Sequence, residues 1–429
     1  MVDDRIAANR ARVEKLIAKG VNVLVPESVI VGEEVGFDNI EPGVVLGPGT
    51  KVLGAETMIG AGTEIQGAAI IKNSLIGRNC SLAAGEYADS VLLDGCSTVG
   101  WARIRGHSAW EEGSNSSHNV DTKTTILGYK TTLGSLINFC NVLMLGGTSP
   151  RLEVGSEVGS GTINFNFLPF GATVGALIKP STVVGSIESP FLACDGAPTR
   201  YAFVGGHTSI IAPVVIGLGT VVAAKSRINP GIYENDKLIG GGNIEKPIVL
   251  DVSKVRILKD ITPKYEILIR QMAITVAFRK WCAFRIEWAK RNNLDKFEIK
   301  LIEGFVAKVD KYMEALEAYG NNIAKYLLAS DDNSRPDSLE KNKTIATGWN
   351  EKIKDRIKAF MSDETGYAEA VAGLNLELDR ITKEESGEAK QFYDVLTKLS
   401  YESVEVKTTK EYFSGLVETI INQVMRDMT

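Results

Sequence analysis

The sequence of 429 residues predicts a β-solenoid, a parallel β-helix of hexapeptide repeats, followed by an α-helical C-terminal domain. Two observations predict this fold class. Aliphatic side chains recur with a six-residue period before residue 250, and beyond it glycine becomes sparse while Lys, Glu, Ala and Leu take helical spacing. We therefore expect a linker-type helix at 1–20, the β-helix at 21–250 and the α-helical domain at 251–429.

The six-residue period fits neither the 3.6-residue repeat of a helix nor the alternation of a plain strand. In a parallel β-helix, each unit is a short strand and a tight corner, with one aliphatic side chain pointing inward and a small residue following it. Three units form a coil of about 18 residues, so this region predicts on the order of ten coils. A β-sandwich would instead show turn signals every 8 to 12 residues or so. The periodic positions are Leu53, Ile59 and Ile65, and then Val204, Ile210, Ile216 and Val222.

The C-terminal part contains several segments with helical periodicity. The stretch 263–292 is apolar on more than one side, which is typical of a helix buried against partners. We interpret its Trp and Phe side chains as core or trimer packing rather than as a ligand pocket. Residues 329–338 (ASDDNSRPDS) read as a turn or loose linker. Further helices are expected at 295–329, 350–361, 366–385, 387–399 and 408–427.

Composition narrows the function classes. The net charge of -5 argues against a broad nucleic-acid footprint. The five cysteines are scattered singly, as expected of reduced thiols in a cytoplasmic protein. The charged N-terminus has no apolar signal-peptide core, and no window approaches ~18 apolar residues. We expect a cytoplasmic protein without a membrane span.

Four strings carry a family resemblance: CSTVGWARIRGHSAWEEG, HNVDTKTTILG, EVGSGTINFNF and AFVGGHTSIIAPVVIGLGTVVAA. In this order they resemble the acetyltransferase part of the bifunctional N-acetylglucosamine-1-phosphate uridyltransferase / glucosamine-1-phosphate acetyltransferase. The resemblance covers roughly residues 5–230 and implies a left-handed β-helix, a homotrimer and an acetyl-CoA or other acyl-CoA co-substrate. No nucleotide loop of the uridyltransferase half precedes residue 5, and the helical domain has no counterpart in that family.

The resemblance implies a sugar-phosphate or nucleotide-sugar site. The family's phosphate-contacting arginine matches Arg105, and its sugar-phosphate lysine matches Lys123. Asn166 matches the family's asparagine, while Asn138 stands where the family has a tyrosine. Asp121 replaces the glutamate that steadies the catalytic histidine. An arginine fork suits phosphate oxygens, although surface charge is the alternative for both cations.

The resemblance also implies an acyl-CoA groove lined by Ser160, Gly206 and Ala224. Lys225 and Arg227, just beyond, are candidates for contacts with cofactor phosphates.

Two departures fall on the expected catalytic site. The family's general-base histidine is Ser135 here, and a second tyrosine is Phe167. Insertions lie within 141–154 and 168–200. N-acetylation needs a base to take the proton of the attacking amine, which a serine hydroxyl does not do unassisted.

The three histidines are His107, His118 and His207. Their separations do not fit the zinc site of γ-type carbonic anhydrases, so no metal is predicted. His118 lies about one coil before Ser135 and is the first candidate for a displaced base, although a solvent-facing loop residue is the interpretation we favour. His207 is interpreted as a polar residue of the groove.

Two functions remain open at this point. The first is a hexapeptide-family transferase acting on a sugar phosphate or nucleotide sugar of the N-acetylglucosamine type, with an acyl-CoA donor. The second is a non-catalytic sugar-nucleotide-binding, scaffold or regulatory homologue whose helical domain recruits a protein partner.

Overall fold

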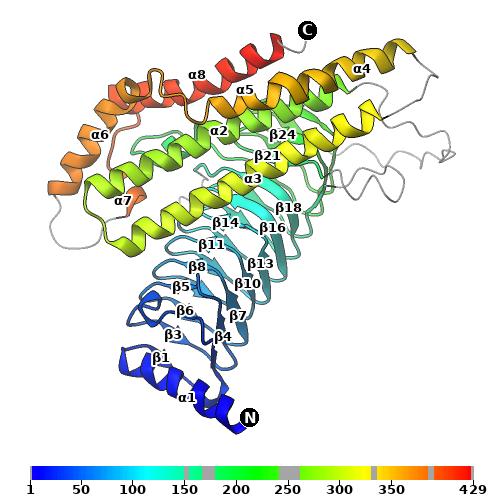
Figure 1. The fold of residues 1–429 in the computed structure, drawn as a ribbon. Coiled ribbons are helices and arrows are strands. Elements are labelled where there is room, and N and C mark those ends of the chain that lie inside the picture. The colour runs from blue at the N-terminus through cyan, green and yellow to red at the C-terminus, as the bar shows by residue number, and fades with distance from the viewer. Residues whose placement is uncertain are drawn as a thin grey trace.

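The computed structural model describes residues 2–148, 154–166, 179–240, 261–329, 336–384 and 391–426. Helix α1 (Val2–Ala18) lies at one end of a long β-solenoid, and a layer of helices lies across the coils at the other end (Figure 1). One continuous sheet contains 11 parallel strands, one from each coil. The predicted fold class, a β-solenoid followed by helices, is therefore confirmed.

Each coil has three sides, which we call the first, second and third faces of the solenoid. The first face contains β1 (Asn22–Val23), β3 (Val45–Leu46), β6 (Glu64–Ile65), β9 (Ser81–Leu82), β12 (Ser97–Thr98), β15 (Asn115–Ser116), β17 (Thr132–Leu133), β19 (Glu157–Val158), β22 (Phe203–Val204), β25 (Val221–Val222) and β28 (Leu238–Ile239). The second face contains β2 (Ile30–Val31), β4 (Lys51–Leu53), β7 (Ala69–Lys72), β10 (Gly85–Ala88), β13 (Ala102–Arg105), the first halves of β16 (Val120–Leu127) and β18 (Asn138–Met144), β20 (Ile163–Phe165), β23 (Ser209–Ile211) and β26 (Arg227–Ile228).

The third face is completed by the second halves of β16 and β18, which bend around one corner. Among the described residues, short 3-10 helices occur in three of the connections. The third-face strands are β5 (Met58–Ile59), β8 (Leu75–Ile76), β11 (Val91–Leu92), β14 (Ala109–Trp110), β21 (Thr182–Val184), β24 (Val214–Ile216) and β27 (Gly231–Tyr233), and the 3-10 helices are η1 (Pro26–Ser28), η2 (Phe37–Asn39) and η3 (Ser189–Ala193).

The interior of the solenoid is a stack of aliphatic side chains, as the six-residue period predicts. Ile59, Ile65, Val204, Ile210, Ile216 and Val222 are all buried in this core. The prediction was wrong at Leu53, which is only half-buried, because the strand places Val52 inward instead. Successive residues of a strand point to opposite sides, so a shift of one residue exchanges the inward position.

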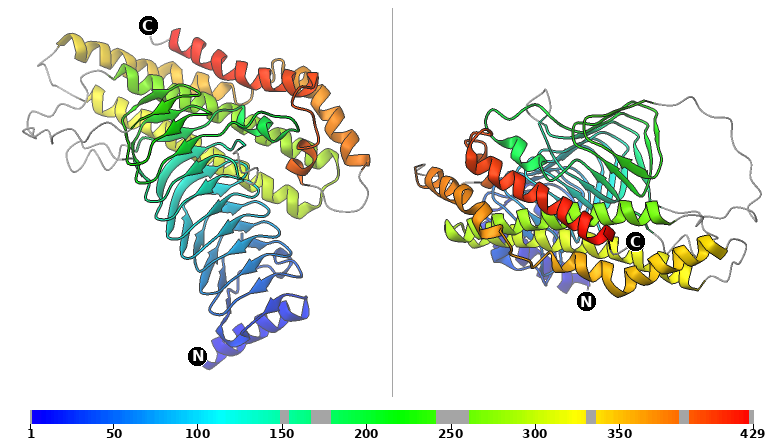
Figure 2. Two further views of the ribbon diagram at one scale, coloured as in Figure 1. Left: turned by 180° about the vertical axis from the view of Figure 1, so that it is seen from behind. Right: turned by 90° about the horizontal axis from the view of Figure 1, so that it is seen from above.

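The helices cover the third face and leave the other two open. Figure 2 shows them gathered on one side of the coils. Outward side chains of this face, such as Val91 and Leu143, join the helical side chains in a second hydrophobic core. The helices are α2 (Thr262–Arg291), α3 (Lys296–Leu328), α4 (Pro336–Gly348), a π-helical segment (Trp349–Ile353), α5 (Lys354–Ala359), α6 (Tyr367–Glu384), α7 (Phe392–Leu396) and α8 (Val404–Arg426).

The predicted helices largely appear, with two differences. Residues 329–338 were predicted as a loose linker, but α4 begins at Pro336, where the missing N–H of proline costs no helical hydrogen bond. Within 387–399 the described helix is only α7. The aromatic side chains of α2, including Trp281 and Trp288, are fully buried in the second core, which identifies them as packing residues. The predicted domain boundary at residue 250 lies outside the described residues.

A buried ion cluster fastens α2 to the coils. Arg285 of α2 donates to Glu111 at 2.6 Å and also to Glu112, and all three side chains are buried. Glu111 also accepts from the backbone N–H of Tyr129 at 2.9 Å. Burial raises the pKa of Glu111 to about 7, although Arg285 opposes the shift. Such a cluster is costly to break, because removing one partner leaves buried charge uncompensated.

Candidate functional site

Ser135, His118 and the predicted groove residues lie on one corner of the solenoid, between the first and second faces. The strands that follow them pair in register, from Asp121 through Asn138, Ile163 and Ser209 to Arg227. Three residues before these positions stand the members of what we call the corner column: His118, Ser135, Ser160, Gly206 and Ala224. The structure thus brings together residues that are spread over more than 100 positions of the sequence.

Hydrogen bonds between successive corners fix this column. The N–H of Leu136 donates to the carbonyl of His118 at 2.8 Å, and the N–H of Gly161 donates to that of Ser135 at 2.8 Å. The same bond joins His207 to Ser160. Leu136 has a φ of 58°, an uncommon conformation for a bulky residue, and its side chain is exposed. The hydrogen bonds of the coil therefore determine the position of Ser135, even though they hold Leu136 in an unfavourable backbone conformation.

His118 and Ser135 are in direct contact. The His118 Nδ1 atom lies 3.4 Å from the Ser135 Oγ atom. Gly100, one coil below with a φ of 68°, leaves the space that the ring occupies: a Cβ there would lie 2.9 Å from the His118 Cδ2 atom. The backbone N–H of Ser135 donates to the Ser160 Oγ atom at 3.0 Å. His118 is exposed, as expected of a solvent-facing loop residue. It also contacts Ser135, as the alternative of a displaced base requires.

Arg105 and Lys123 lie side by side on the second face, toward the corner opposite the column. They are register partners on β13 and β16. Cys140 continues this row on β18, where burial first, and then Asp121, raises the pKa of its thiol. Arg105, Lys123 and Lys179 oppose that shift, so three cations act at this point of the face. The two predicted phosphate-binding side chains, Arg105 and Lys123, are therefore neighbours on this face, Lys123 exposed and Arg105 partly buried.

Asp121 does not orient a histidine in this structure. Its Oδ2 atom accepts from Arg105 at 3.3 Å and lies 4.0 Å from Arg103. Arg103 also pairs with Glu86 at 2.8 Å. Sequence comparison with the family missed Arg103, although its spacing of two from Arg105 on a strand places both on the same face. The carboxylate of Asp121 therefore lies against arginines of the second face rather than against a histidine.

The other predicted residues surround this centre. Asn138 is exposed beside Asp121, and Asn166 directly follows β20. Asn164 is the buried member of that segment, donating to the Cys140 carbonyl at 2.8 Å. Lys225 and Arg227 are exposed on one coil, three coils beyond Ser135. Phe167 lies outside the described residues.

Two further features are absent from the described part of the chain. No three His, Cys, Asp or Glu side chains gather closely enough to hold a metal ion there. None of the helices in those ranges is both long and apolar enough to cross a bilayer.

Comparison with known proteins supports a resemblance rather than a membership. No family model matches the chain. The chain is similar to proteins described as bifunctional protein GlmU. That of Cyanothece sp. (strain PCC 7425) is 28% identical over 231 residues, which are 54% of this chain and 44% of that protein. That of Thermosipho africanus is 27% identical over 257 residues, which are 58% of this chain and 49% of that protein.

A third relative is the GlmU of Streptococcus equi subsp. zooepidemicus, 27% identical over 248 residues, covering 56% of this chain and 46% of its own. This chain therefore spans less than half the length of these curated relatives. Together, the hexapeptide solenoid and the matched region define a chain that resembles the β-helical part of the GlmU proteins. The helices that follow residue 261 lie beyond the solenoid on which this resemblance rests.

Proposed function

We propose that this chain is a hexapeptide-family transferase that acts on a sugar phosphate or nucleotide sugar of the N-acetylglucosamine type. Its donor is an acyl-CoA, most simply acetyl-CoA. The observation that carries the proposal is the contact between His118 and Ser135 beside the cations Arg105 and Lys123. It supports the proposal because an imidazole, a hydroxyl and two cationic side chains lie along neighbouring coils of the same face.

The roles follow from charge and geometry. Arg105 and Lys123 bind the phosphate of the acceptor, because a guanidinium fork and an ammonium group suit phosphate oxygens. The pantetheine arm lies along Ser160, Gly206 and Ala224, where side chains are small. Lys225 and Arg227 lie further along the same direction and suit the cofactor phosphates.

His118 takes the place of the missing base. Its imidazole accepts the proton that the acceptor amine loses as it attacks the thioester carbonyl, and the thiol of the donor leaves. Ser135 passes this proton or hydrogen-bonds the attacking group, since its hydroxyl both donates and accepts. A contact of 3.4 Å is long for catalysis, but such contacts commonly tighten once substrate is bound.

A second candidate is a non-catalytic sugar-nucleotide-binding, scaffold or regulatory protein. It is favoured by the pairing of Asp121 with arginines, which leaves the histidine without a carboxylate to orient it. In that case Arg105 and Lys123 still bind the ligand, and the exposed outer surface of the helical layer recruits a protein partner.

One assay separates these candidates. The full chain is mixed with acetyl-CoA and glucosamine 1-phosphate, and release of the free thiol is followed. The transferase predicts release that requires the acceptor. Binding of UDP-N-acetylglucosamine by calorimetry, without any thiol release, supports the second candidate and excludes the first for this donor and acceptor.

We also propose a homotrimer whose sites lie between neighbouring solenoids. Several large apolar side chains are exposed on the open faces near the corner column, and a second copy of the chain is the natural cover for them. They are Val99, Trp101, Leu136, Ile163 and Phe165. Analytical ultracentrifugation should show a trimer at micromolar concentration, and a stable monomer there would contradict shared sites.

A further inference from the structure

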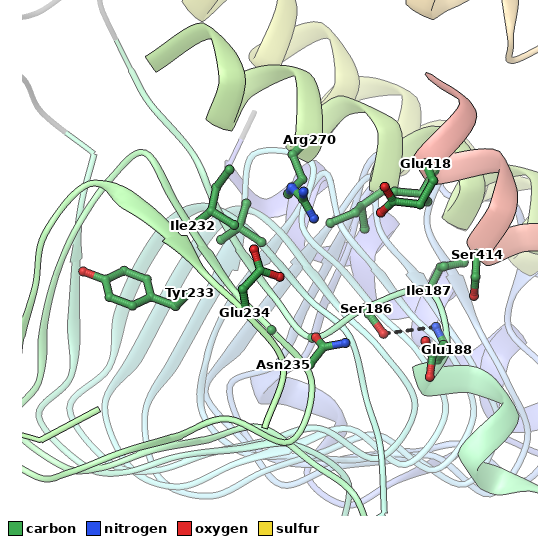
Figure 3. Close-up of a pocket in the computed structure, with 15 residues that line it drawn as sticks. Ser186, Ile187, Glu188, Ile232, Tyr233, Glu234, Asn235, Arg270, Ser414 and Glu418 are labelled. Carbon is green, nitrogen blue, oxygen red and sulfur yellow. Dashed lines mark hydrogen bonds between the residues drawn. The ribbon is translucent and has the colours of Figure 1, made fainter. Parts of the chain in front are cut away.

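A cavity of about 160 Å³ lies between the last coils of the solenoid and helices α2 and α8. Arg270 of α2 and Glu418 of α8 form its helical wall, and Glu234, just after β27, forms the opposite wall (Figure 3). Hydroxyl and amide groups of Ser186 and Asn235 add hydrogen-bonding capacity. The cavity is on the helix-covered side of the molecule and is separate from the corner column.

Three of the four charged side chains that line this cavity, Glu234, Arg270 and Glu418, have no ion-pair partner among the described residues. No nitrogen of Arg270 lies within 4.0 Å of the carboxylate of Glu234 or Glu418, although all three line the same space. Glu188, a further carboxylate of the lining, is already paired with Arg200 at 3.1 Å. Arg270 is half-buried, so its guanidinium has lost part of its hydration without gaining a counter-ion. Opposite charges held apart around a cavity leave room for a charged molecule between them.

The charges and the size define which molecule fits. One guanidinium and two uncompensated carboxylates are complemented by one carboxylate and two cationic groups. A phosphate dianion would face two carboxylates and one cation, which disfavours sugar phosphates and nucleotides. The volume is also well below the ~300–1,000 Å³ of pockets for drug-sized ligands, which excludes an acyl-CoA.

The apolar part of the lining suits a methylene chain. Ile187, Ile232 and Val417 line the cavity between the charged walls. Long basic side chains bury their methylene stems along apolar surface while their charged ends reach polar groups. A molecule with charges at both ends and an aliphatic middle matches this arrangement.

We propose that this cavity binds a free basic amino acid of the lysine or ornithine type. Its carboxylate pairs with Arg270, in the bidentate manner that a guanidinium allows. Its two ammonium groups pair with Glu234 and Glu418, and its methylene chain lies against the apolar lining. This site does not depend on the proposed transferase function.

The test is isothermal titration calorimetry of the full chain with L-lysine and three analogues that each lack one charge. Cadaverine lacks the carboxylate, ε-aminocaproate lacks the α-ammonium group, and norleucine lacks the side-chain ammonium group. Each analogue should bind about ten-fold to a hundred-fold more weakly than L-lysine, because each loses one charge-assisted interaction. The variant Arg270→Gln should abolish the preference for L-lysine over cadaverine.

Glu418→Gln should weaken binding of L-lysine by a similar factor. Glu411→Gln, an equally exposed position of the same helix that does not line the cavity, is the matched control and should not. Equal melting temperatures of both variants and the wild type establish that each is folded. Failure of L-lysine to bind at millimolar concentration would overturn the proposal. So would equal binding of cadaverine and L-lysine, or an Arg270→Gln variant that binds L-lysine as the wild type does.

Discussion

The second and third faces of the solenoid have the same coiled backbone, but only the third is covered by helices. The strands of both faces direct aliphatic side chains into the solenoid, and they differ in the side chains that point outward. On β18, Asn138 points outward from the second face and is exposed, whereas Leu143 points outward from the third face and is fully buried by the helices. A β-helix therefore assigns function by its outward residues: polar positions leave a face free for ligands, and apolar positions make it a platform for packing.

The largest loss of stability should come from breaking the buried ion cluster on the side that the helices cover. Arg285→Ala should lower the free energy of unfolding by about 3–5 kcal/mol, because it leaves Glu111 and Glu112 buried without a counter-charge. Urea denaturation followed by circular dichroism measures this. Arg279→Ala, which removes the partly exposed pair with Asp310, is the control and should cost no more than about 1 kcal/mol. Equal losses in the two variants would mean that Arg285 is not a buried anchor.

A second comparison uses the two outward positions of β18. Leu143→Ala should destabilise the chain by about 2–5 kcal/mol, since it opens a cavity between coil and helix. Asn138→Ala should change the free energy of unfolding by no more than about 0.5 kcal/mol. Similar losses at both positions would show that the Asn138 side chain is packed as tightly as that of Leu143.

For ligand affinity we expect the reverse: a substitution on the second face should weaken binding, and one on the covered side should not. Arg105→Ala should weaken binding of UDP-N-acetylglucosamine or glucosamine 1-phosphate by about 1.5–3 kcal/mol, because a charge-assisted pair with phosphate is lost. Calorimetry on folded variants measures this, with Arg279→Ala as a control on the covered side. An unchanged affinity in Arg105→Ala would remove this residue from the site.

The smallest expected effect is a pH dependence of helix docking. Burial raises the pKa of Glu298 on α3 to about 8, and Asp94 and Glu112 add to the shift. A carboxyl whose pKa is raised by folding stabilises the fold fully below its unfolded pKa, near 4.5, and that contribution is lost as pH rises toward about 8. Glu298→Gln removes the cost of burying an ionised carboxylate at higher pH.

The variant should therefore gain about 1–2 kcal/mol relative to wild type between pH 5 and pH 8, counting ~1.4 kcal/mol per pKa unit and discounting for solvent. Denaturation midpoints at several pH values test it. A difference between the two proteins that stays constant over this range would contradict a raised pKa.

The hexapeptide period was sufficient to predict the solenoid, because one inward aliphatic residue per unit is a requirement of the coil. The same period predicted that His118 and Ser135 could approach, since they lie about one coil apart. The register of Ser135 with Ser160 and Gly206 did not follow from the period, because insertions separate these residues in the sequence. The role of Asp121 could not be predicted, because its choice between Arg105 and a histidine depends on side-chain geometry that spacing does not encode.

The sequence also contains a pattern that indicates where the helices pack on the solenoid. Third-face strands carry two apolar residues in succession, and both sides of such a strand must be buried. Val91 and Leu92 are one such pair, as are Leu143 and Met144. The buried charges Arg285 and Glu111 gave no signal, because they lie far apart in the sequence and each reads as a surface residue. The cavity at Arg270 was hidden for the same reason, since its walls come from three distant segments.

The most direct test of the proposed site on the open second face is acceptor-dependent thiol release from acetyl-CoA by wild type and two histidine variants. His118→Ala should reduce the rate by about 10²–10⁴-fold, the contribution of a positioned base. His107→Ala, on the opposite corner of the second face, should leave the rate unchanged. A His118→Ala variant that releases thiol as fast as the wild type would contradict the assignment of His118 as the displaced base. A wild type that releases no thiol with glucosamine 1-phosphate would also contradict it.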